Sequence, residues 1–351
     1  MESKDSVIAA ENLCKEFHVG ESGKGFIGSV KALFNRRGRT IHALDNVNFR
    51  INRGEFVGYV GENGAGKSTT IKILTGILVP TSGMASVNGI VPYENRVENA
   101  KRIGVVFGQR TQLWWDLPVR ESYEMLRVIF RVSRNDFTAM MEKISKTLDI
   151  DSVMDMPVRK LSLGQRMRCD LAAALIHRPS VIFLDEPTIG LDVLAKENIR
   201  NFLAELNKTE GATIILTTHD MNDIERLCKR LIILDKGRAV FDGEMDDLKK
   251  RFVSGKILEV EFHEYIEKLP EIPELSIVRE KGNKKWLKFE NKDRGIAEII
   301  GVLAGNYSIK DLSVREPSVE SIIRSIYKKT VLLPKHVDEP FGETEKDGDK
   351  K

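Results

Sequence analysis

The chain has 351 residues, of which 41% are hydrophobic and 30% are charged. These are ordinary values for a globular protein, and the length allows one full-sized domain and a smaller one. The formal net charge of +3 is small for this length, so a globally basic nucleic-acid-binding protein is not indicated.

The start of the chain and its cysteines indicate where the protein works. No apolar run approaches the roughly 18 residues that span a bilayer. The opening MESKDSV lacks the apolar region of a secretion signal, so none is predicted. Cys14, Cys169 and Cys228 stand far apart without metal-ligand spacing. Such a set predicts reduced, mostly buried thiols in a cytosol rather than a disulfide framework.

Residues 23–39, GKGFIGSVKALFNRRGR, combine apolar and basic side chains in a helical pattern. The apolar positions are Phe26, Ile27, Val30, Leu33 and Phe34. The basic positions are Lys24, Lys31, Arg36, Arg37 and Arg39. The spacing predicts a basic amphipathic helix within the segment 20–40.

Strands are predicted over residues 42–50 and 55–60, and the second leads through GENGAGKS into the helical pattern STTIKILTGIL. Strand, glycine-rich turn and helix begin an α/β unit. Three later runs are short and fully apolar, as buried parallel strands are: 103–107, 181–185 and 213–218. Helical patterns occur at roughly 119–131, 135–148, 164–177, 192–208 and 220–227. The order predicts a parallel sheet with helices on both faces.

The pattern changes toward the carboxyl end of the chain. DKGRAVFDG, residues 235–243, predicts a closing hairpin, followed by a helix in DDLKKRF. Residues 256–330 alternate between strand and helix patterns and predict a separate small α+β domain. Residues 331–351 are polar and punctuated by glycine and proline, so they predict a disordered tail.

GENGAGKS, residues 61–68, fits the phosphate-binding pattern G-x-x-x-x-G-K-[ST] between a predicted strand and a predicted helix. Its glycines let backbone N–H groups close around phosphate oxygens, and the helix N-terminus adds its dipole. Lys67 is expected to neutralise the β- and γ-phosphates, Ser68 to bind Mg²⁺ and Thr69 to hold the α-phosphate. The alternative is a glycine-rich turn without a ligand. The predicted nucleotide-binding residues of this loop are Gly61, Glu62, Asn63, Gly64, Ala65, Gly66, Lys67, Ser68 and Thr69.

VIFLDEP, residues 181–187, ends an apolar strand in two acids. Asp185 is placed to hold Mg²⁺ through water, as the second acid of a P-loop enzyme does. Glu186 can polarise the attacking water as a general base. Alone, the pair would also fit the acidic N-terminus of a helix. Its position after a phosphate-binding loop and before another apolar strand favours the catalytic interpretation.

Two weaker motifs are LSLGQ, residues 161–165, and TTHD, residues 217–220. Ser162 and Gly164 precede a predicted helix and would suit either a phosphate-binding helix N-terminus or an ordinary N-cap. His219 follows an apolar strand, where a lone histidine usually has a structural role.

In their order and spacing, the motifs together resemble those of the ATP-binding-cassette (ABC) ATPases. They are the loop at 61–68, Gln109 after IGVVFG, LSLGQ, VIFLDEP, GLD at 190–192 and His219. The resemblance covers about residues 6–250. It implies an α/β P-loop NTPase domain over 1–250, with a mixed core sheet, an antiparallel β subdomain and a helical subdomain at about 110–165. The small α+β domain would follow it.

The resemblance also implies a head-to-tail dimer that encloses two ATP molecules. Each ATP would lie on the loop of one copy, against Ser162, Gly164 and Gln165 of the other. Asp192 would cross the interface between the copies. The partner would be a second copy of the chain or a paralogous cassette. Leu163 replaces the glycine of the commonest signature, yet binding is expected to persist.

The remaining residue roles follow from the same resemblance. Gln109 would reach Mg²⁺ and the attacking water and signal to a membrane partner, and His219 would contact the γ-phosphate. Phe17 ends an L-x-K-x-F stretch that begins at Leu13, and is the candidate for stacking on adenine. A phenylalanine of the core is the alternative.

A cassette with a small extra domain and no membrane span resembles the ATP-binding subunits of ABC-2-type exporters, of the drug-resistance and polysaccharide-export kinds. On this basis the chain would lie peripherally at the cytoplasmic face of the membrane beside a separate permease. Residues 23–39 would form an interfacial helix, or alternatively a helix packed on the protein's own surface. Trp114 and Trp115 are candidates for the permease contact, with a role in the core as the alternative.

A soluble cassette acting on the ribosome or on nucleic acid is the competing function. Translation-type cassette proteins generally join two cassettes in one chain, whereas only one set of motifs occurs here. No nucleic-acid partner is therefore expected.

Overall fold

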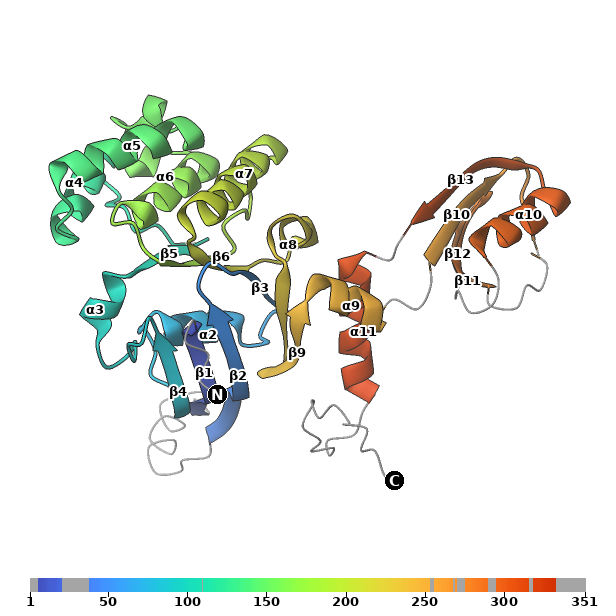
Figure 1. Ribbon diagram of the computed structural model, residues 1–351, viewed down its shortest axis with the longest axis horizontal. Coiled ribbons are helices and arrows are strands. Elements are labelled where there is room, and N and C mark those ends of the chain that lie inside the picture. The colour runs from blue at the N-terminus through green and yellow to red at the C-terminus, as the bar shows by residue number, and fades with distance from the viewer. Residues whose placement is uncertain are drawn as a thin grey trace, which may run out of the picture. The chain divides into compact units, whose positions relative to one another are not determined.

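The computed structural model describes residues 6–20, 38–108, 110–252, 256–267, 269, 275–289, 295–315 and 318–332. The chain divides into two compact units, Met1–Leu248 and Lys249–Lys351. Figure 1 shows the elements of both. No helix within the described ranges is long and apolar enough to cross a membrane.

In the described part of the first unit, the centre is a six-stranded sheet with the order β5-β6-β7-β3-β8-β9. Its strands are β3 (Phe56–Gly61), β5 (Ile103–Phe107), β6 (Val181–Asp185), β7 (Thr213–Thr217), β8 (Arg230–Asp235) and β9 (Arg238–Glu244). β9 pairs antiparallel with β8, and the other strand pairs are parallel. Parallel strands end at one edge of the sheet, so the loops that follow β3, β5, β6 and β7 converge there.

Helices cover both faces of this sheet, as the apolar strand runs require. The helices of this part of the chain are α2 (Lys67–Leu74), α3 (Arg96–Ala100), α4 (Val119–Ile129), α5 (Arg134–Leu148), α6 (Leu163–Leu175), α7 (Val193–Glu210), α8 (Met221–Leu227) and α9 (Met245–Phe252), which crosses the division between the two units. Short 3₁₀ turns lie at Asp151–Val153 and Val158–Lys160. Figure 1 shows α4, α5, α6 and α7 gathered on one side of the core sheet and α2 on the other.

A second, antiparallel sheet has the order β2-β1-β4. Its strands are β1 (Ser6–Gly20), β2 (Gly38–Asn52) and β4 (Ser82–Val87). Buried side chains of β1, β2 and β4 join those of α2 and of the core strands in one apolar cluster. The antiparallel sheet therefore shares one hydrophobic core with the six-stranded sheet and α2.

The second unit has, over its described residues, a four-stranded antiparallel sheet with the order β11-β12-β10-β13. Its elements are β10 (Lys256–Phe262), β11 (Leu275–Lys281), β12 (Lys284–Phe289), α10 (Ile296–Asn306), β13 (Ile309–Arg315) and α11 (Val319–Leu332). Alternate residues of the central strands, such as Leu258, Val260 and Leu287, pack against Ile299 and Leu303 of α10. Figure 1 shows α10 against one face of this sheet.

Most predicted elements match in type, but β1, β4, α3 and β11 were not predicted as elements. Register shifts interrupt β1 repeatedly, with Asn12 in the left-handed region at φ 49°, so its sequence lacks regular alternation. β4 is rich in small residues, and β11 is largely exposed. None of these strands has the apolar period that marks a strand in sequence.

Two predictions for the ends of segments need correction. Gly38 and Arg39 belong to β2, so the helix predicted over 23–39 is wrong at these two positions, while 21–37 lie outside the described residues. α11 continues to Leu332, two residues into the predicted tail, and residues 333–351 are not described.

The core of the second unit gives a direct test of its independence. Leu287→Ala should lower the free energy of unfolding of this unit by about 2–5 kcal/mol, because Leu287 is fully buried in its core. ATP affinity should not change, since no described wall residue of the cavity analysed below comes from this unit. Scanning calorimetry and nucleotide titration measure the two effects. Val278→Ala, at an exposed edge position, is the control. A matching loss of ATP affinity would contradict the separation.

Candidate active site

A cavity of about 500 Å³ opens at the edge of the core sheet where the parallel strands end. Its volume lies within the range of small-ligand sites. Residues from distant parts of the sequence line it: Ala43, Glu62, Asn63, Gly64, Gly66, Lys67, Ser68, Thr69, Lys72, Ile77, Phe107, Gly108, Arg110, Asp185 and Glu186. The fold thus brings the glycine-rich loop together with both acids that end β6.

Glycine is required where the loop enters α2. Gly66 is the N-cap of α2 at φ 109°, and a Cβ there would lie 2.6 Å from the carbonyl oxygen of Ala43. A side chain would therefore be strained and would also collide with β2. The sharp turn directs the amino end of α2 at the cavity, where its first N–H groups have no partner within the helix. Such an end is a binding site for phosphate.

Lys67 lies at the floor of the cavity with a buried side chain. Its Nζ donates to the carbonyl oxygens of Gly61 at 2.6 Å and Glu62 at 3.2 Å. Burial lowers the pKa of Lys67, and the charges of Glu186 and Asp185 oppose that change. The loop therefore holds a positive charge beside the helix N-terminus, where a phosphate group would lie.

Asp185 is oriented by two hydroxyl groups. Ser68 Oγ donates to its Oδ2 at 3.2 Å, and Thr217 Oγ1 donates to its Oδ1. Thr217 is the direct neighbour of Asp185 in the pairing of β6 with β7. A hydroxyl and a carboxylate that converge on one point provide the oxygen ligands that Mg²⁺ prefers. The residues therefore fit a magnesium ion held by few protein atoms together with phosphate and water.

Glu186 has a constrained backbone. It lies in the left-handed region at φ 57°, and its N–H donates to the carbonyl oxygen of Thr217 at 2.9 Å. A Cβ at position 108 would lie 2.4 Å from the carbonyl oxygen of Glu186, so Gly108 permits this close approach. Strained residues cluster at functional sites because the surrounding structure must hold them in place.

His219 Nδ1 lies 2.8 Å from Glu186 Oε2. The predicted base, which lines the cavity, thus pairs with the predicted γ-phosphate contact, which is not among the described wall residues. A carboxylate paired with a histidine can accept a proton from water and keep its own orientation while it does so.

Phe17 lies in β1 opposite Ile41 of β2, and does not belong to the described walls of the cavity. It is 38% exposed, and Lys15 Nζ lies 5.3 Å from its ring centroid. The alternative that Phe17 is a core residue is therefore wrong. Its ring is available to a planar ligand, but the contact with adenine stays a prediction.

The signature residues form helix caps within their own chain. Ser162 Oγ accepts from the N–H of Gln165 at 3.2 Å, and Gln165 Oε1 accepts from the N–H of Ser162 at 2.9 Å. Asp192 caps α7 by accepting from the N–H of Ala195 at 2.8 Å. None of these, nor Gly164, is among the described cavity residues. The N-cap alternative thus describes their role inside one copy.

Two further predicted positions have different outcomes. Gln109 lies outside the described residues, although its neighbours Gly108 and Arg110 line the cavity. The side chain of Leu163 covers Gly190, because a Cβ at Gly190 would lie 2.5 Å from Leu163 Cδ2. The unusual signature residue therefore packs against the loop that leads to Asp192.

Sequence reasoning assigned no role to several residues of the site. Thr217 orients Asp185, and Ala43, Lys72, Ile77 and Arg110 form parts of the cavity wall. Thr217 has a signal in the sequence, because it is the last residue of an apolar strand that neighbours the strand of the two acids. The wall residues come from separate elements and become neighbours only in the folded chain.

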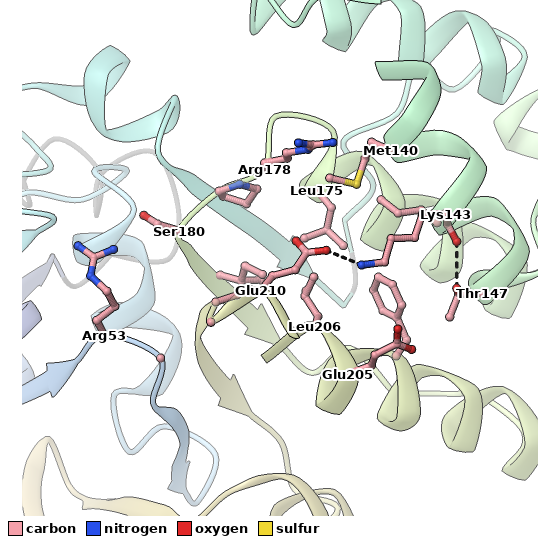
Figure 2. Close-up of a pocket in the computed structure, with 17 residues that line it drawn as sticks. Arg53, Met140, Lys143, Thr147, Leu175, Arg178, Ser180, Glu205, Leu206 and Glu210 are labelled. Atoms are coloured by element: carbon pink, nitrogen blue, oxygen red, sulfur yellow. Dashed lines mark hydrogen bonds and ion pairs between the residues drawn. The ribbon is translucent and has the colours of Figure 1, made fainter. Parts of the chain in front are cut away.

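A second cavity of about 510 Å³ lies elsewhere in the first unit. Figure 2 shows it between α5 and α7, with Lys143 bonded to Glu210. The Nζ–Oε1 distance is 2.6 Å. Ser180 and Ala212, which line it, precede β6 and β7, so it lies at the opposite ends of these strands from Asp185. Its described lining residues include no glycine-rich phosphate-binding turn.

The family model described as ABC transporter matches residues 44–189. The ABC transporter ATP-binding protein NatA of Bacillus subtilis is 33% identical over 215 residues, which are 61% of this chain and 87% of NatA. The chain belongs to the ABC transporter ATP-binding proteins. It is an ATPase of that family, with the cassette fold that its motifs predicted.

Other ABC relatives differ in their named transport function. The Nod factor export ATP-binding protein I of Rhizobium etli is 37% identical over 61% of this chain and 67% of its own length. The methionine import ATP-binding protein MetN of Latilactobacillus sakei is 30% identical over 84% of this chain and 87% of its own length. Similarity alone therefore does not separate export from import.

A solved ABC cassette has the same fold as the first unit. The dimeric structure of MJ0796 in a post-hydrolysis state, bound to ADP and Pi, matches with a TM-score of 0.57 at 28% identity. The match covers 68% of this chain and 98% of that one. The cassette resemblance is thereby confirmed at the level of fold and family.

Glu186→Gln should abolish most hydrolysis and leave ATP binding intact. The amide keeps the shape of the carboxylate but cannot accept the proton of water, so turnover should fall by about 10²-fold or more. Single-turnover hydrolysis and equilibrium binding measure the two properties. Glu205→Gln, on the exposed side of α7, is the matched control. Turnover near that of the unchanged protein would remove Glu186 from the base role.

Thr217→Val should weaken the response to Mg²⁺. The substitution keeps the size of the side chain but removes the hydroxyl that orients Asp185. The Mg²⁺ concentration for half-maximal ATPase activity should rise by about tenfold. Thr218→Val removes a neighbouring hydroxyl that bonds to Asp220 instead. Equal shifts in both variants would contradict a specific role for Thr217.

Proposed function

We propose that the chain is the ATP-binding and ATP-hydrolysing subunit of an ABC-2-type exporter, and that it drives a separate membrane permease. The observation that supports it most is the cavity that unites the P-loop with Asp185 and Glu186 in a cassette followed by a small α+β unit. The similarity to a Nod factor export protein supports the exporter class. The similarity to MetN makes an import subunit the second candidate.

Within one copy, the P-loop would hold the phosphates of ATP. Backbone N–H groups from Gly61 to Thr69 would surround the phosphate oxygens, and Lys67 would contact the β- and γ-phosphates. Ser68 and Asp185 would hold Mg²⁺, which neutralises charge on the phosphates when bound. Phe17 would stack on adenine.

Glu186 would accept a proton from the attacking water, with His219 holding the carboxylate and contacting the γ-phosphate. Gln109 would contact the same water and the metal ion. These roles agree with the pairing of His219 Nδ1 and Glu186 Oε2 at 2.8 Å. Arrangement and charge together would lower the barrier to hydrolysis.

A second copy, or a paralogous cassette, would complete each site. Ser162, Gly164, Gln165 and Asp192 would then contact ATP held by the other copy. Ser162 Oγ accepts a bond within its capping box, which leaves its own hydrogen for a phosphate oxygen. Nearby apolar side chains support a contact surface, because Val193 and Leu194 are 84% and 72% exposed. The dimeric MJ0796 structure is consistent with this proposal.

The permease would dock on the outer face of α4 and the loop before it. Met125, Val128 and Ile129 are exposed at positions i, i+3 and i+4, so they share one face of the helix. Trp115, in the loop before α4, is exposed, whereas Trp114 is half-buried. An exposed apolar face of this kind suits a helix of a membrane partner.

Residues 23–39 would contact the cytoplasmic membrane surface beside the permease. Gly20 and Gly38 pair across β1 and β2, so all of this segment except Gly38 and Arg39 connects two paired strands. Five basic residues in that segment would be attracted by anionic headgroups. The protein would then lie peripherally on the membrane. Both proposed surfaces serve the membrane system, so no nucleic-acid partner is proposed.

Affinity purification of tagged Glu186→Gln protein from gently solubilised membranes tests this function. A stoichiometric membrane protein with several spans is the expected companion. Ribosomal proteins or nucleic acid without such a companion would favour the soluble-cassette alternative. Once the permease is identified, cells that carry it together with the Glu186→Gln chain can be assayed for its cargo. The cargo should accumulate inside these cells if the system exports, and should be missing from them if it imports.

Trp115→Ala should weaken recovery of the permease but leave the ATPase activity of the isolated chain unchanged. The indole is 50% exposed, and loss of a buried interface aromatic typically costs about 2 kcal/mol of binding energy. Met84→Ala, an exposed apolar position on β4, serves as the control. Loss of soluble protein would instead place Trp115 in the core.

A further inference from the structure

The segment that follows position 109 is bonded to α6 through a buried carboxylate. Asp170 lies in α6 and is only 4% exposed. Its Oδ1 accepts from Thr111 Oγ1 at 2.8 Å and from the N–H of Gln112 at 3.0 Å. In return, Gln112 Nε2 donates to the carbonyl oxygen of Asp170 at 2.9 Å. Three hydrogen bonds thus join two residues of the segment to one residue of the helix.

A carboxylate is a costly group to bury. Burial raises the pKa of Asp170 to about 6, and the bonds from Thr111 and Gln112 oppose that rise. The following residues of α6 are apolar, as packing alone would favour. The hydrogen-bond donors of the segment and the nearby charge of Arg166 oppose the cost of burying this carboxylate. Its specific contribution is therefore to hold that segment.

The chain on the other side of position 109 is joined to the catalytic strand. Phe107 is the neighbour of Asp185 in the pairing of β5 with β6. The N–H of Gly108 donates to the carbonyl oxygen of Asp185 at 2.7 Å. Only positions 109 and 110 separate this attachment from Thr111. Hydrogen bonds thus join Gly108 to the end of β6 and Thr111 to α6, the helix that begins with the signature.

A further hydrogen bond joins α6 to α4, the helix that follows the segment. Tyr123 Oη donates to the carbonyl oxygen of Cys169 at 3.0 Å, with both residues buried. A displacement of α6 must therefore move the segment 111–123 with it. That displacement would reach the cavity wall at Arg110, which directly precedes Thr111.

We propose that Asp170 is a positioning residue for ATP hydrolysis, which transmits the position of the signature helix to Gly108 and Arg110 in the cavity wall. When ATP on a second copy binds the amino end of α6, Asp170 holds Gly108 and Arg110 in the positions that hydrolysis requires beside Asp185 and Glu186. This inference rests on the proposed engagement of Ser162 across the dimer.

The test compares steady-state hydrolysis by full-length variants, with kcat referred to the fraction of molecules that binds nucleotide. Asp170→Asn keeps an oxygen acceptor for both donors, so kcat should stay within about twofold of the unchanged chain. Asp170→Ala leaves both donors unpaired and should lower kcat by about tenfold. KM for ATP should change by less than about threefold, because Asp170 does not line the described nucleotide cavity.

Thr111→Val covers the case in which Asp170→Ala does not fold. It removes one of the two donors to Oδ1 and should lower kcat by about threefold. In the double variant, Thr111→Val should cause no further loss in the Asp170→Ala background, because both act through one contact.

Two results would overturn the proposal. One is unchanged kcat in both Asp170→Ala and Thr111→Val. The other is an equal loss in Asp170→Asn and Asp170→Ala, which would point to the charge rather than to the contact.

Ser162→Arg separates failure of this inference from failure of the proposed dimer. If Ser162→Arg keeps full activity, engagement across the dimer is wrong, and the inference loses its basis. If Ser162→Arg is inactive while Asp170→Ala and Thr111→Val keep normal kcat, the dimer stands and only the role of Asp170 is wrong.

Discussion

The pairing of β6 with β7 is the interaction on which the site depends. It places Asp185 opposite Thr217, whose hydroxyl and carbonyl groups hold the Asp185 carboxylate and the Glu186 backbone. Because β3 and β5 run parallel to these strands, the P-loop and the turn after Phe107 reach the same edge. A change of register by one residue would turn Asp185 to the opposite face of the sheet and separate it from Ser68.

Close backbone approach is the second constraint. Gly66 and Gly108 leave room for main-chain atoms that a Cβ would meet at 2.6 and 2.4 Å. At Gly66 this space forms the phosphate-facing turn, and at Gly108 it accommodates the strained conformation of Glu186. Strain at Glu186 is tolerated because strand pairing on both sides holds it. Asp170 adds a third constraint, because its hydrogen bonds join Thr111 and Gln112 to the signature helix.

The sequence predicted the parts of the molecule whose signals are local. The P-loop needs glycines, a lysine and a hydroxyl at fixed spacing, and buried strands need apolar runs, so 61–68 and 181–186 were recognisable. Strand β1 was not, because bulges break its period. The bond between Thr217 and Asp185, and the contact of Leu163 with Gly190, depend on register and packing between distant segments. No local pattern encodes such contacts, and nothing in the sequence singles out Asp170.

The proposed function requires that ATP is hydrolysed at a site completed by a second copy. Mixing Lys67→Ala chains with Ser162→Arg chains tests it most directly. Each variant alone has two defective sites in its dimer and should be inactive. A mixed dimer has one site with both defects and one site with neither, so activity should appear on mixing. A mixture no more active than its separate components would contradict the claim.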